Sequence, residues 1–253
     1  MCYHTSSKGT PAELKKAFDA PFAGEENYLP QFHANGFAHP KLPVFAKDEI
    51  RLLQWGLMPN WSGKSLQDML RMAKGNLNAR NDTIFEKPSF RDSIWNQDPA
   101  QIKRCVIPSS GIFEPHTHKG VKYPFYIYPQ DQPFFFLAGI YSHWKDPKTK
   151  IWYSTYSIIT TEPNRIARKI HNENDRMPVI LHQQDIALWC DPNTPRAVLE
   201  DLMRPAPEEG ISALPVSRDI FLSSVNSNRP DIFQHVAYPE LAHDPELFHG
   251  FNI

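Results

Sequence analysis

The sequence contains few cysteines and glycines, no excess of charge and no long apolar run. Its 253 residues include only 3 cysteines, Cys2, Cys105 and Cys190. Their odd number and the absence of a CxxC pair argue against a disulfide framework. No apolar stretch approaches the roughly 18 residues that a membrane helix needs, so we expect no membrane association. The first ten residues, MCYHTSSKGT, contain no apolar core of a signal peptide, and we therefore expect a cytoplasmic protein.

The charges of the chain nearly balance, with a formal net charge of -1. This excludes a polycation that coats nucleic acid by charge alone. The segment 231–253 carries four acids and no lysine or arginine, so the remainder has -1 minus -4, that is +3. Because there is no repeat or flexible linker, we expect one domain over residues 1–253, with 231–253 as an acidic C-terminal tail.

Short β-rich runs alternate with short helical patterns along the chain. Strands are expected on either side of the turn 47–49 within 42–58, and at 102–107, 123–128, 134–141, 151–160 and 177–181. Helices are expected at 11–20, at 65–73 before Gly75, from the Thr161-Glu162-Pro163 segment to about Ile170, at 183–190 and at 196–203. Since regular βαβ alternation is missing, the pattern predicts an α+β fold with a mixed, largely antiparallel, barrel-like β core and peripheral helices.

Cys2 becomes the first residue if Met1 is removed, as is usual before a small second residue, and then carries a free α-amine and a thiol. Their ordinary pKa values are about 7.7–8.0 and about 8.5, so both groups are partly nucleophilic near neutral pH. With an aldehyde, such an amine forms an imine and the thiol closes onto it as a five-membered thiazolidine. Alternatively, Cys2 is only a small residue that follows Met1.

The segment 76–83 (NLNARNDT) follows a basic stretch, with a net charge of +3 over residues 64–80. The amide of Asn78 can both donate and accept hydrogen bonds, and the planar fork of Arg80 suits a phosphate. The alternative interpretation is a helix end beside a solvated basic face.

Glu114 has apolar neighbours in the segment 108–116 (PSSGIFEPH). Loss of solvent raises the pKa of a carboxyl group and makes it usable for proton transfer near neutral pH. The alternative is a surface glutamate at a strand end. His116 and His118 follow, but no third ligand is evident, so we expect an ordinary loop and no metal site there.

The segment 170–181 (IHNENDRMPVIL) offers a histidine and an arginine. His171 is expected at the C-terminal end of a helix, where the dipole favours the imidazolium and acid–base chemistry is feasible. Arg176 is a second candidate contact for an anion. The alternative is a helix-capping histidine and a solvated arginine.

Taken in order, these motifs resemble the SOS response-associated peptidase (SRAP) family of abasic-site processing proteins. The resemblance spans nearly the whole chain. It is carried by Met1-Cys2, Gly36-Phe37 to Pro40, Trp55 to Pro59, Asn78 to Arg80, Gly111 to Glu114, His171 with Arg176 to Pro178, and Pro215 to Ser217 with Val225-Asn226.

The resemblance implies an SRAP-type, autoproteolytic peptidase that forms a covalent thiazolidine cross-link with abasic sites in single-stranded DNA. Cys2 matches the cross-linking cysteine, and Asn78 matches the asparagine that holds this cysteine and the sugar. Glu114 matches the glutamate of N-terminal release and proton transfer. His171 matches the histidine of sugar ring opening and cross-link reversal, although many members have their histidine two residues before the Arg-Met-Pro run and not five.

The resemblance also assigns DNA contacts. Arg80 and Arg176 match arginines that bind phosphates near the lesion, and Trp55 and Trp61 are candidates for stacking on DNA or shaping its groove. The near-neutral charge favours a short footprint with few phosphate contacts. We expect a monomer without cofactor or metal, which associates with the nucleoid when it acts on DNA.

Two other function classes remain open at this stage. One is an N-terminal-nucleophile amidase or peptidase that uses Cys2 on a small amide, with Asn78 or backbone amides as oxyanion donors. The other is a non-catalytic module for single-stranded nucleic acid, in which Cys2 is incidental. A metal enzyme is less favoured than either, because the sequence shows no convincing ligand set.

Overall fold

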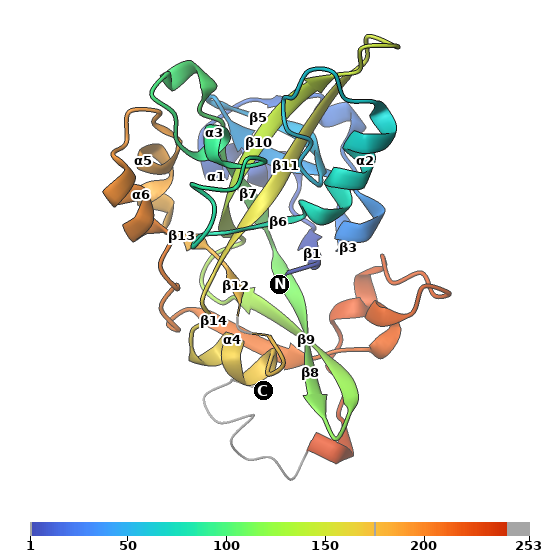
Figure 1. Cartoon of the computed structure of the whole chain (residues 1–253). Helices are drawn as coiled ribbons and strands as arrows, with labels where there is room; N and C mark the ends of the chain where they lie inside the picture. The colour runs from blue at the N-terminus through green and yellow to red at the C-terminus, as the bar shows by residue number, and fades with distance from the viewer. Residues whose placement is uncertain (1, 175, 242–253) are drawn as a thin grey trace.

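The computed structural model describes residues 2–174 and 176–241, and its strands form a barrel and a separate sheet (Figure 1). Five strands close the barrel in the order β5-β4-β7-β10-β11, and β11 pairs back in parallel with β5 through Thr155–Gln54 and Tyr156–Trp55. The other pairings around the barrel are antiparallel. This confirms the mixed, largely antiparallel barrel. The strands are β4 (Lys41–Ala46), β5 (Glu49–Trp55), β7 (Arg104–Ser109), β10 (Phe135–Lys145) and β11 (Trp152–Thr161).

Four short strands are added to the outside of this barrel: β2 (Phe22–Ala23), β6 (Asn78–Arg80), β12 (Met177–Pro178) and β13 (Ile180–Leu181). β6 pairs in parallel with residues 158–160 of β11, and β12 pairs antiparallel with residues 160–161 of the same strand. The C-terminal end of β11 therefore brings β6 and β12 close to one another, although nearly a hundred residues separate them in sequence.

Alternate residues of the barrel strands belong to two different hydrophobic clusters. Cys105 and Ile107 pack in one cluster with residues of the second sheet, whereas Val106 packs in the other with residues of the helices. The period of two is that of a strand with both faces covered. Gly139 on β10 is favoured here, since a Cβ at this position would come 2.9 Å from the main-chain oxygen of Ser157 on β11 as well as 2.4 Å from Ile107 Cδ1.

The second sheet has the order β14-β9-β8-β1-β3 and is antiparallel throughout. In the lower half of Figure 1, β8, β9 and β14 lie beneath the barrel. Thr5 pairs with Ile112, and continuing this register places Glu114 opposite Tyr3, next to Cys2. The strands are β1 (His4–Ser7), β3 (Gln31–Asn35), β8 (Gly111–His118), β9 (Val121–Pro129) and β14 (Ile211–Pro215).

The loop predicted at His116–His118 is wrong. These residues continue β8, because Thr117 pairs with Lys122 and His118 pairs with Val121 up to the hairpin turn. The strands β1, β2, β3, β6, β8 and β14 were not among those predicted from the sequence.

The helices lie on the outside of the barrel and beside the second sheet, with α5 and α6 on the left and α2 on the right of Figure 1. They are α1 (Pro11–Phe18), α2 (Leu66–Gly75), α3 (Arg91–Ile94), α4 (Arg165–Ile170), α5 (Ile186–Cys190) and α6 (Arg196–Leu202). Short 3-10 turns occur at Glu25–Asn27, Gly36–Ala38, Pro99–Gln101, Gln183–Asp185, Arg218–Phe221, Pro230–Phe233 and Pro239–Leu241. In the described part of the chain, no helix has the length and apolar character that crossing a bilayer requires.

The helix expected to start at Thr161-Glu162-Pro163 begins later, at Arg165. Strand β11 continues through Thr161, and the Asn164 side chain accepts a hydrogen bond from the Ala167 amide as the N-cap. The N-cap bond fixes the start of the helix more strongly than the proline does.

The acidic tail is described only as far as Leu241. Ile232 and Leu241 are fully buried, so this first part of the tail packs on the body of the protein. The remainder of the tail, 242–253, lies outside the described residues.

Candidate functional site

Cys2 lies two residues before the start of β1 and is fully buried. Its main-chain carbonyl accepts a hydrogen bond of 2.8 Å from Nδ2 of Asn78, the first residue of β6. Asn78 in turn is held by the parallel pairing of β6 with Ile158 on β11. The barrel therefore fixes the backbone of Cys2 through a side chain that is 76 residues away in sequence.

The thiol of Cys2 is held in its neutral form. Burial raises its pKa well above the ordinary value, and the negative charge of Glu114 raises it further. Sγ lies 3.7 Å from the carbonyl oxygen of His4, to which it donates a weak hydrogen bond. A buried cysteine of this kind is a poor thiolate nucleophile in the resting protein.

Glu114 reaches the site from β8, and His171 reaches it from the C-terminal end of α4. The end of α4 is fixed to β8 on both sides of His171. Nδ1 of His116 lies 3.1 Å from the carbonyl oxygen of Lys169. The Asn172 side chain accepts from the Thr117 amide at 2.9 Å and donates to the Thr117 carbonyl at 2.8 Å.

These contacts bring Nδ1 of His171 to 3.0 Å from Oε2 of Glu114. The distance is that of an ion pair, while the angles fall outside those of an aligned hydrogen bond. Both side chains are nearly inaccessible, with 6% of Glu114 and 10% of His171 exposed. The longer spacing between His171 and Arg176 therefore does not remove this histidine from the site.

Two acceptors at the site have no hydrogen-bond partner among the described residues. They are Oδ1 of Asn78 and Oε1 of Glu114, and both are buried. A buried polar atom without a partner costs about 1–3 kcal/mol, so native proteins retain few of them. Their presence here indicates a site built to receive hydrogen-bond donors.

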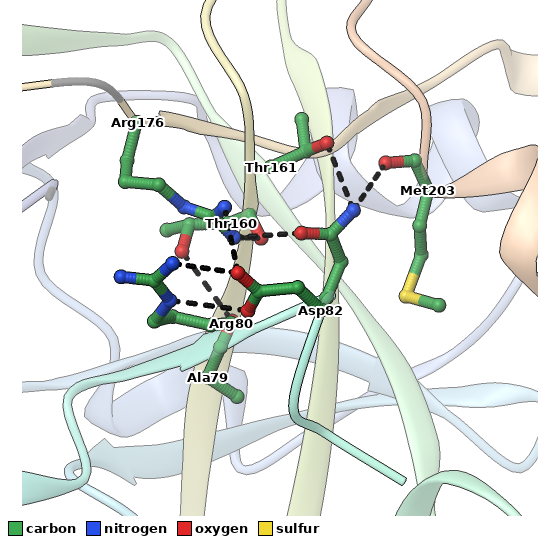
Figure 2. A network of polar contacts seen from close by, with 8 residues as sticks. Ala79, Arg80, Asp82, Thr160, Thr161, Arg176 and Met203 are labelled. Carbon is green, nitrogen blue, oxygen red and sulfur yellow. Dashed lines mark hydrogen bonds and ion pairs between the residues drawn. The ribbon is translucent and has the colours of Figure 1, made fainter.

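Arg80, the last residue of β6, and Arg176 come together where both contact the carboxylate of Asp82 (Figure 2). Arg80 donates two hydrogen bonds to Asp82, from Nε to Oδ1 at 3.1 Å and from Nη2 to Oδ2 at 2.6 Å. Nη1 of Arg176 lies 3.7 Å from Asp82 Oδ2, and its Nη2 donates to Asn81 Oδ1 at 2.7 Å and to the Thr160 carbonyl. The structure thus brings the two predicted phosphate-binding arginines together.

The charges of this cluster are set by these contacts. The hydrogen bonds from Arg80 hold the pKa of Asp82 below its ordinary value, and Arg176 contributes in the same direction. Burial lowers the pKa of Arg176, and the negative charge of Asp82 partly offsets this lowering. At neutral pH the cluster therefore has two guanidinium charges and one carboxylate charge.

The two tryptophans differ in their surroundings. Trp55 is fully buried, so its ring is not exposed for stacking on DNA, and a part in shaping the groove stays a prediction. Its indole N–H instead donates to the Leu77 carbonyl at 2.8 Å, and its ring stacks on Tyr156. The hydrogen bond supports Leu77, the residue before Asn78. Trp61 is half-buried and lines a cavity of about 260 Å³ with His143 and Trp152. A DNA contact by Trp61 stays a prediction.

A sequence profile described as SOS response associated peptidase (SRAP) matches residues 1–223. The chain belongs to the SRAP family. This confirms the resemblance of its motifs to that family and agrees with the α+β barrel fold.

Relatives of this SRAP protein are bacterial, viral and vertebrate. It is 32% identical over 224 residues to the abasic site processing protein YoqW of Bacillus subtilis, covering 83% of this chain and 92% of YoqW. It is 31% identical over 199 residues to the abasic site processing protein HMCES of Gallus gallus, covering 71% of this chain and 55% of HMCES. A crystal structure of a protein from Bacteroides thetaiotaomicron superimposes with a TM-score of 0.86 at 35% identity, covering 93% of this chain and all of that one.

Asp82 is a member of this SRAP site that sequence reasoning missed. Its signal in the sequence is weak, an acid two residues after an arginine, and only the turn after β6 shows that the two side chains face each other. Within the described residues, no three histidine, cysteine, aspartate or glutamate side chains are grouped so that they could hold a metal ion.

Proposed function

We propose that this protein captures abasic sites in single-stranded DNA covalently, through a thiazolidine that forms on Cys2 once Met1 has been removed. The observation that carries the proposal is the hydrogen bond from Asn78 to the Cys2 carbonyl, beside the Glu114–His171 pair. The names of the relatives YoqW and HMCES, both abasic site processing proteins, support the same lesion as substrate.

The proposed reaction balances without an oxidant, reductant or cofactor. The ring-opened abasic sugar presents an aldehyde at C1′. The free α-amine of Cys2 adds to this carbon, and loss of the resulting hydroxyl as water gives an imine. The Cys2 sulfur then adds to the imine carbon while the thiol proton is transferred to the nitrogen. One C–N bond and one C–S bond form, and one water leaves.

Three side chains have separate tasks in this scheme. Asn78 holds the main chain of Cys2, so that amine and thiol face one place, and its unpartnered Oδ1 accepts from the amine or from a sugar hydroxyl. Glu114 takes a proton from the attacking amine through its free Oε1 and returns it to the departing hydroxyl. His171, 3.0 Å from Glu114, assists sugar ring opening and reversal of the cross-link.

We also assign the release of Met1 to this site, as an autoproteolytic hydrolysis of one peptide bond. In this step Glu114 would accept a proton, a role supported by the register of β8 with β1, which sets Glu114 opposite Tyr3, next to Cys2. The product of the hydrolysis is the free amine that the cross-linking reaction needs.

The state of the thiol favours this chemistry over a cysteine amidase. An amidase begins with attack by the thiolate, and burial keeps the Cys2 thiol protonated. In thiazolidine formation the amine attacks first, and the sulfur reacts only with the more electrophilic imine. Arg80 and Arg176 supply phosphate contacts next to β6, the strand that carries Asn78.

The experiment that tests the proposal compares three oligonucleotides of one sequence. The first carries an abasic site made by uracil glycosylase, the second carries the same site reduced with borohydride, and the third is intact. We expect a denaturant-resistant band shift with the first strand only, because the other two lack an aldehyde. A shift with the reduced strand, or equal binding to all three without any covalent product, would refute it and support a simple binding module.

A further inference from the structure

Asp82 occupies the position in the Arg80 fork that a DNA phosphate would take. Both oxygens of its carboxylate accept from Arg80, in the two-point geometry that guanidinium groups also use for phosphates. Oδ2 is shared with Arg176, at 3.7 Å. Figure 2 shows both guanidinium groups turned toward this one carboxylate.

The local backbone keeps Asp82 at this place. Asn81 anchors the turn after β6, since its amide donates to the Thr160 carbonyl at 2.9 Å and its side chain donates to Thr161 Oγ1 at 3.1 Å. Asp82 follows directly and is only two residues from Arg80. A tethered group of this kind has an effective concentration in the millimolar range or above, so an incoming phosphate must compete with it.

The two arginines differ in their freedom to leave the carboxylate. The Arg176 side chain is 10% exposed and is fixed by Asn81 and Thr160, whereas the Arg80 side chain is 54% exposed. Arg80 can therefore turn from Asp82 to a phosphate by rotating its side chain, while Arg176 stays in place. The switch requires no movement of β6 or β12.

A purely structural role would explain this ion pair poorly. The side chain of Asp82 is 45% exposed, and exposed ion pairs contribute little to the stability of a fold. A bidentate contact with an exposed arginine does, however, neutralise one positive charge in a cluster of two. The negative charge thus reduces the attraction of the cluster for DNA more than it stabilises the protein.

We propose that Asp82 is a specificity-determining residue, a resident anion that competes with DNA phosphates for Arg80 and Arg176 and so keeps binding to undamaged single strands weak. This inference rests on the proposed function, in which both arginines contact the strand that carries the lesion. Weak reversible binding lets the protein leave undamaged DNA, while the covalent bond retains it at an abasic site.

The test measures reversible binding of an intact, fluorescein-labelled oligonucleotide by anisotropy at several salt concentrations. The variant Asp82→Asn keeps the size of the side chain and removes its charge. We expect it to bind about twofold to fivefold more tightly than the wild type. The plot of log affinity against log salt should become steeper by about 0.7, the value for one further phosphate contact on a single strand.

Two variants serve as controls. Asp231→Asn removes the same charge from an exposed aspartate that lies 3.0 Å from Arg229, and it should change neither affinity nor slope. Asp82→Glu keeps the charge and should bind like the wild type. Asp82→Asn binding no more tightly than the wild type, or a gain equal to that of Asp231→Asn, would overturn the proposal.

Folding and cross-linking are measured in the same series. If Asp82→Asn melts well below the wild type, Asp82→Ala replaces it, and loss of folding in both would show that Asp82 is structural and the proposal wrong. Covalent capture of an abasic strand by the wild type is recorded in parallel. Its absence would refute the proposed function, whereas capture together with unchanged binding by Asp82→Asn would refute only the role of Asp82.

Discussion

The amide group of Asn78 donates a hydrogen bond of 2.8 Å to the main-chain carbonyl of Cys2. This bond joins Cys2 to β6, a short strand that pairs with the barrel. The oxygen of the same amide group, Asn78 Oδ1, has no hydrogen-bond partner among the described residues. One side chain thus both fixes Cys2 and offers an acceptor beside it.

Replacing Asn78 with alanine removes the support of Cys2. We expect capture of abasic DNA to slow by about tenfold or more, and the free energy of unfolding to fall by about 1–3 kcal/mol because a buried carbonyl loses its donor. Asn76→Ala is the matched control, since Asn76 is also buried and donates to a main-chain carbonyl, that of Leu57, at 3.1 Å. Equal loss of capture in both variants would mean that the effect is only destabilisation.

Glu114→Gln keeps the shape of the side chain and removes its ability to accept a proton. We expect cross-link formation at pH 7 to slow by about a hundredfold, within the range of general base catalysis, with reversible DNA binding unchanged. Single-turnover gels give the rate, and Glu86→Gln, at an exposed position, is the control. An unaltered rate for Glu114→Gln would remove this residue from the mechanism.

His171→Ala tests the steps that involve the sugar ring. The variant should bind intact DNA as the wild type does, but ring opening and reversal of the cross-link should slow by about tenfold to a hundredfold. Reversal is followed by transfer of the protein to a second, labelled abasic strand. His118→Gln, at the outer end of β8, should change neither step. His171 has no part in either step if both rates stay at the wild-type value.

The buried side chain of His33 should make the stability of the folded protein depend on pH. Burial lowers its pKa to about 4, with a smaller contribution from the charge of His4. Between pH 4 and pH 6.5 the unfolded chain therefore binds more protons at this residue than the folded protein does, so stability rises with pH in this window and falls as the pH is lowered.

When the pH falls from 7 to 5, protonation of His33 in the unfolded chain should lower the free energy of unfolding by about 2 kcal/mol, since each pKa unit corresponds to about 1.4 kcal/mol. Urea unfolding at the two pH values measures the loss. His33→Gln should show a smaller loss over the same interval, and the exposed His182→Gln should behave like the wild type. A loss that is the same in all three proteins would assign the pH dependence to other groups.

The barrel strands could be read from the sequence because their apolar runs are covered on both faces. Phe134–Ile140 is such a run, and it corresponds to the buried part of β10. The strand β1, which lies between β8 and β3 in the second sheet, could not be found in this way. Its residues, His4–Ser7, are small or polar, and hydroxyl contacts such as Thr5 Oγ1 to Ser109 Oγ of β7 at 2.7 Å satisfy them in the interior.

The candidate site, like the fold, could be predicted in part from the sequence. Residue types suggested Cys2, Asn78 and Glu114, and the fold brings the first two into contact. The resemblance to the SRAP family had already paired Asn78 with Cys2 and had named His171, which lies 3.0 Å from Glu114. The shared partner of Arg80 and Arg176 was not found from the sequence. Asp82 meets Arg80 because of the turn after β6. Trp55, a candidate for stacking on DNA or shaping its groove, is buried because alternate residues of β5 point into the barrel.

The central claim is that Cys2 becomes the N-terminal residue and that its amine and thiol together bind the abasic sugar. Intact mass spectrometry after incubation with an abasic oligonucleotide tests it most directly. We expect one adduct, equal in mass to the protein without Met1 plus the oligonucleotide minus one water, in the wild type and in Cys190→Ser but not in Cys2→Ala. A denaturant-resistant adduct on Cys2→Ala, or an adduct that still contains Met1, would contradict it.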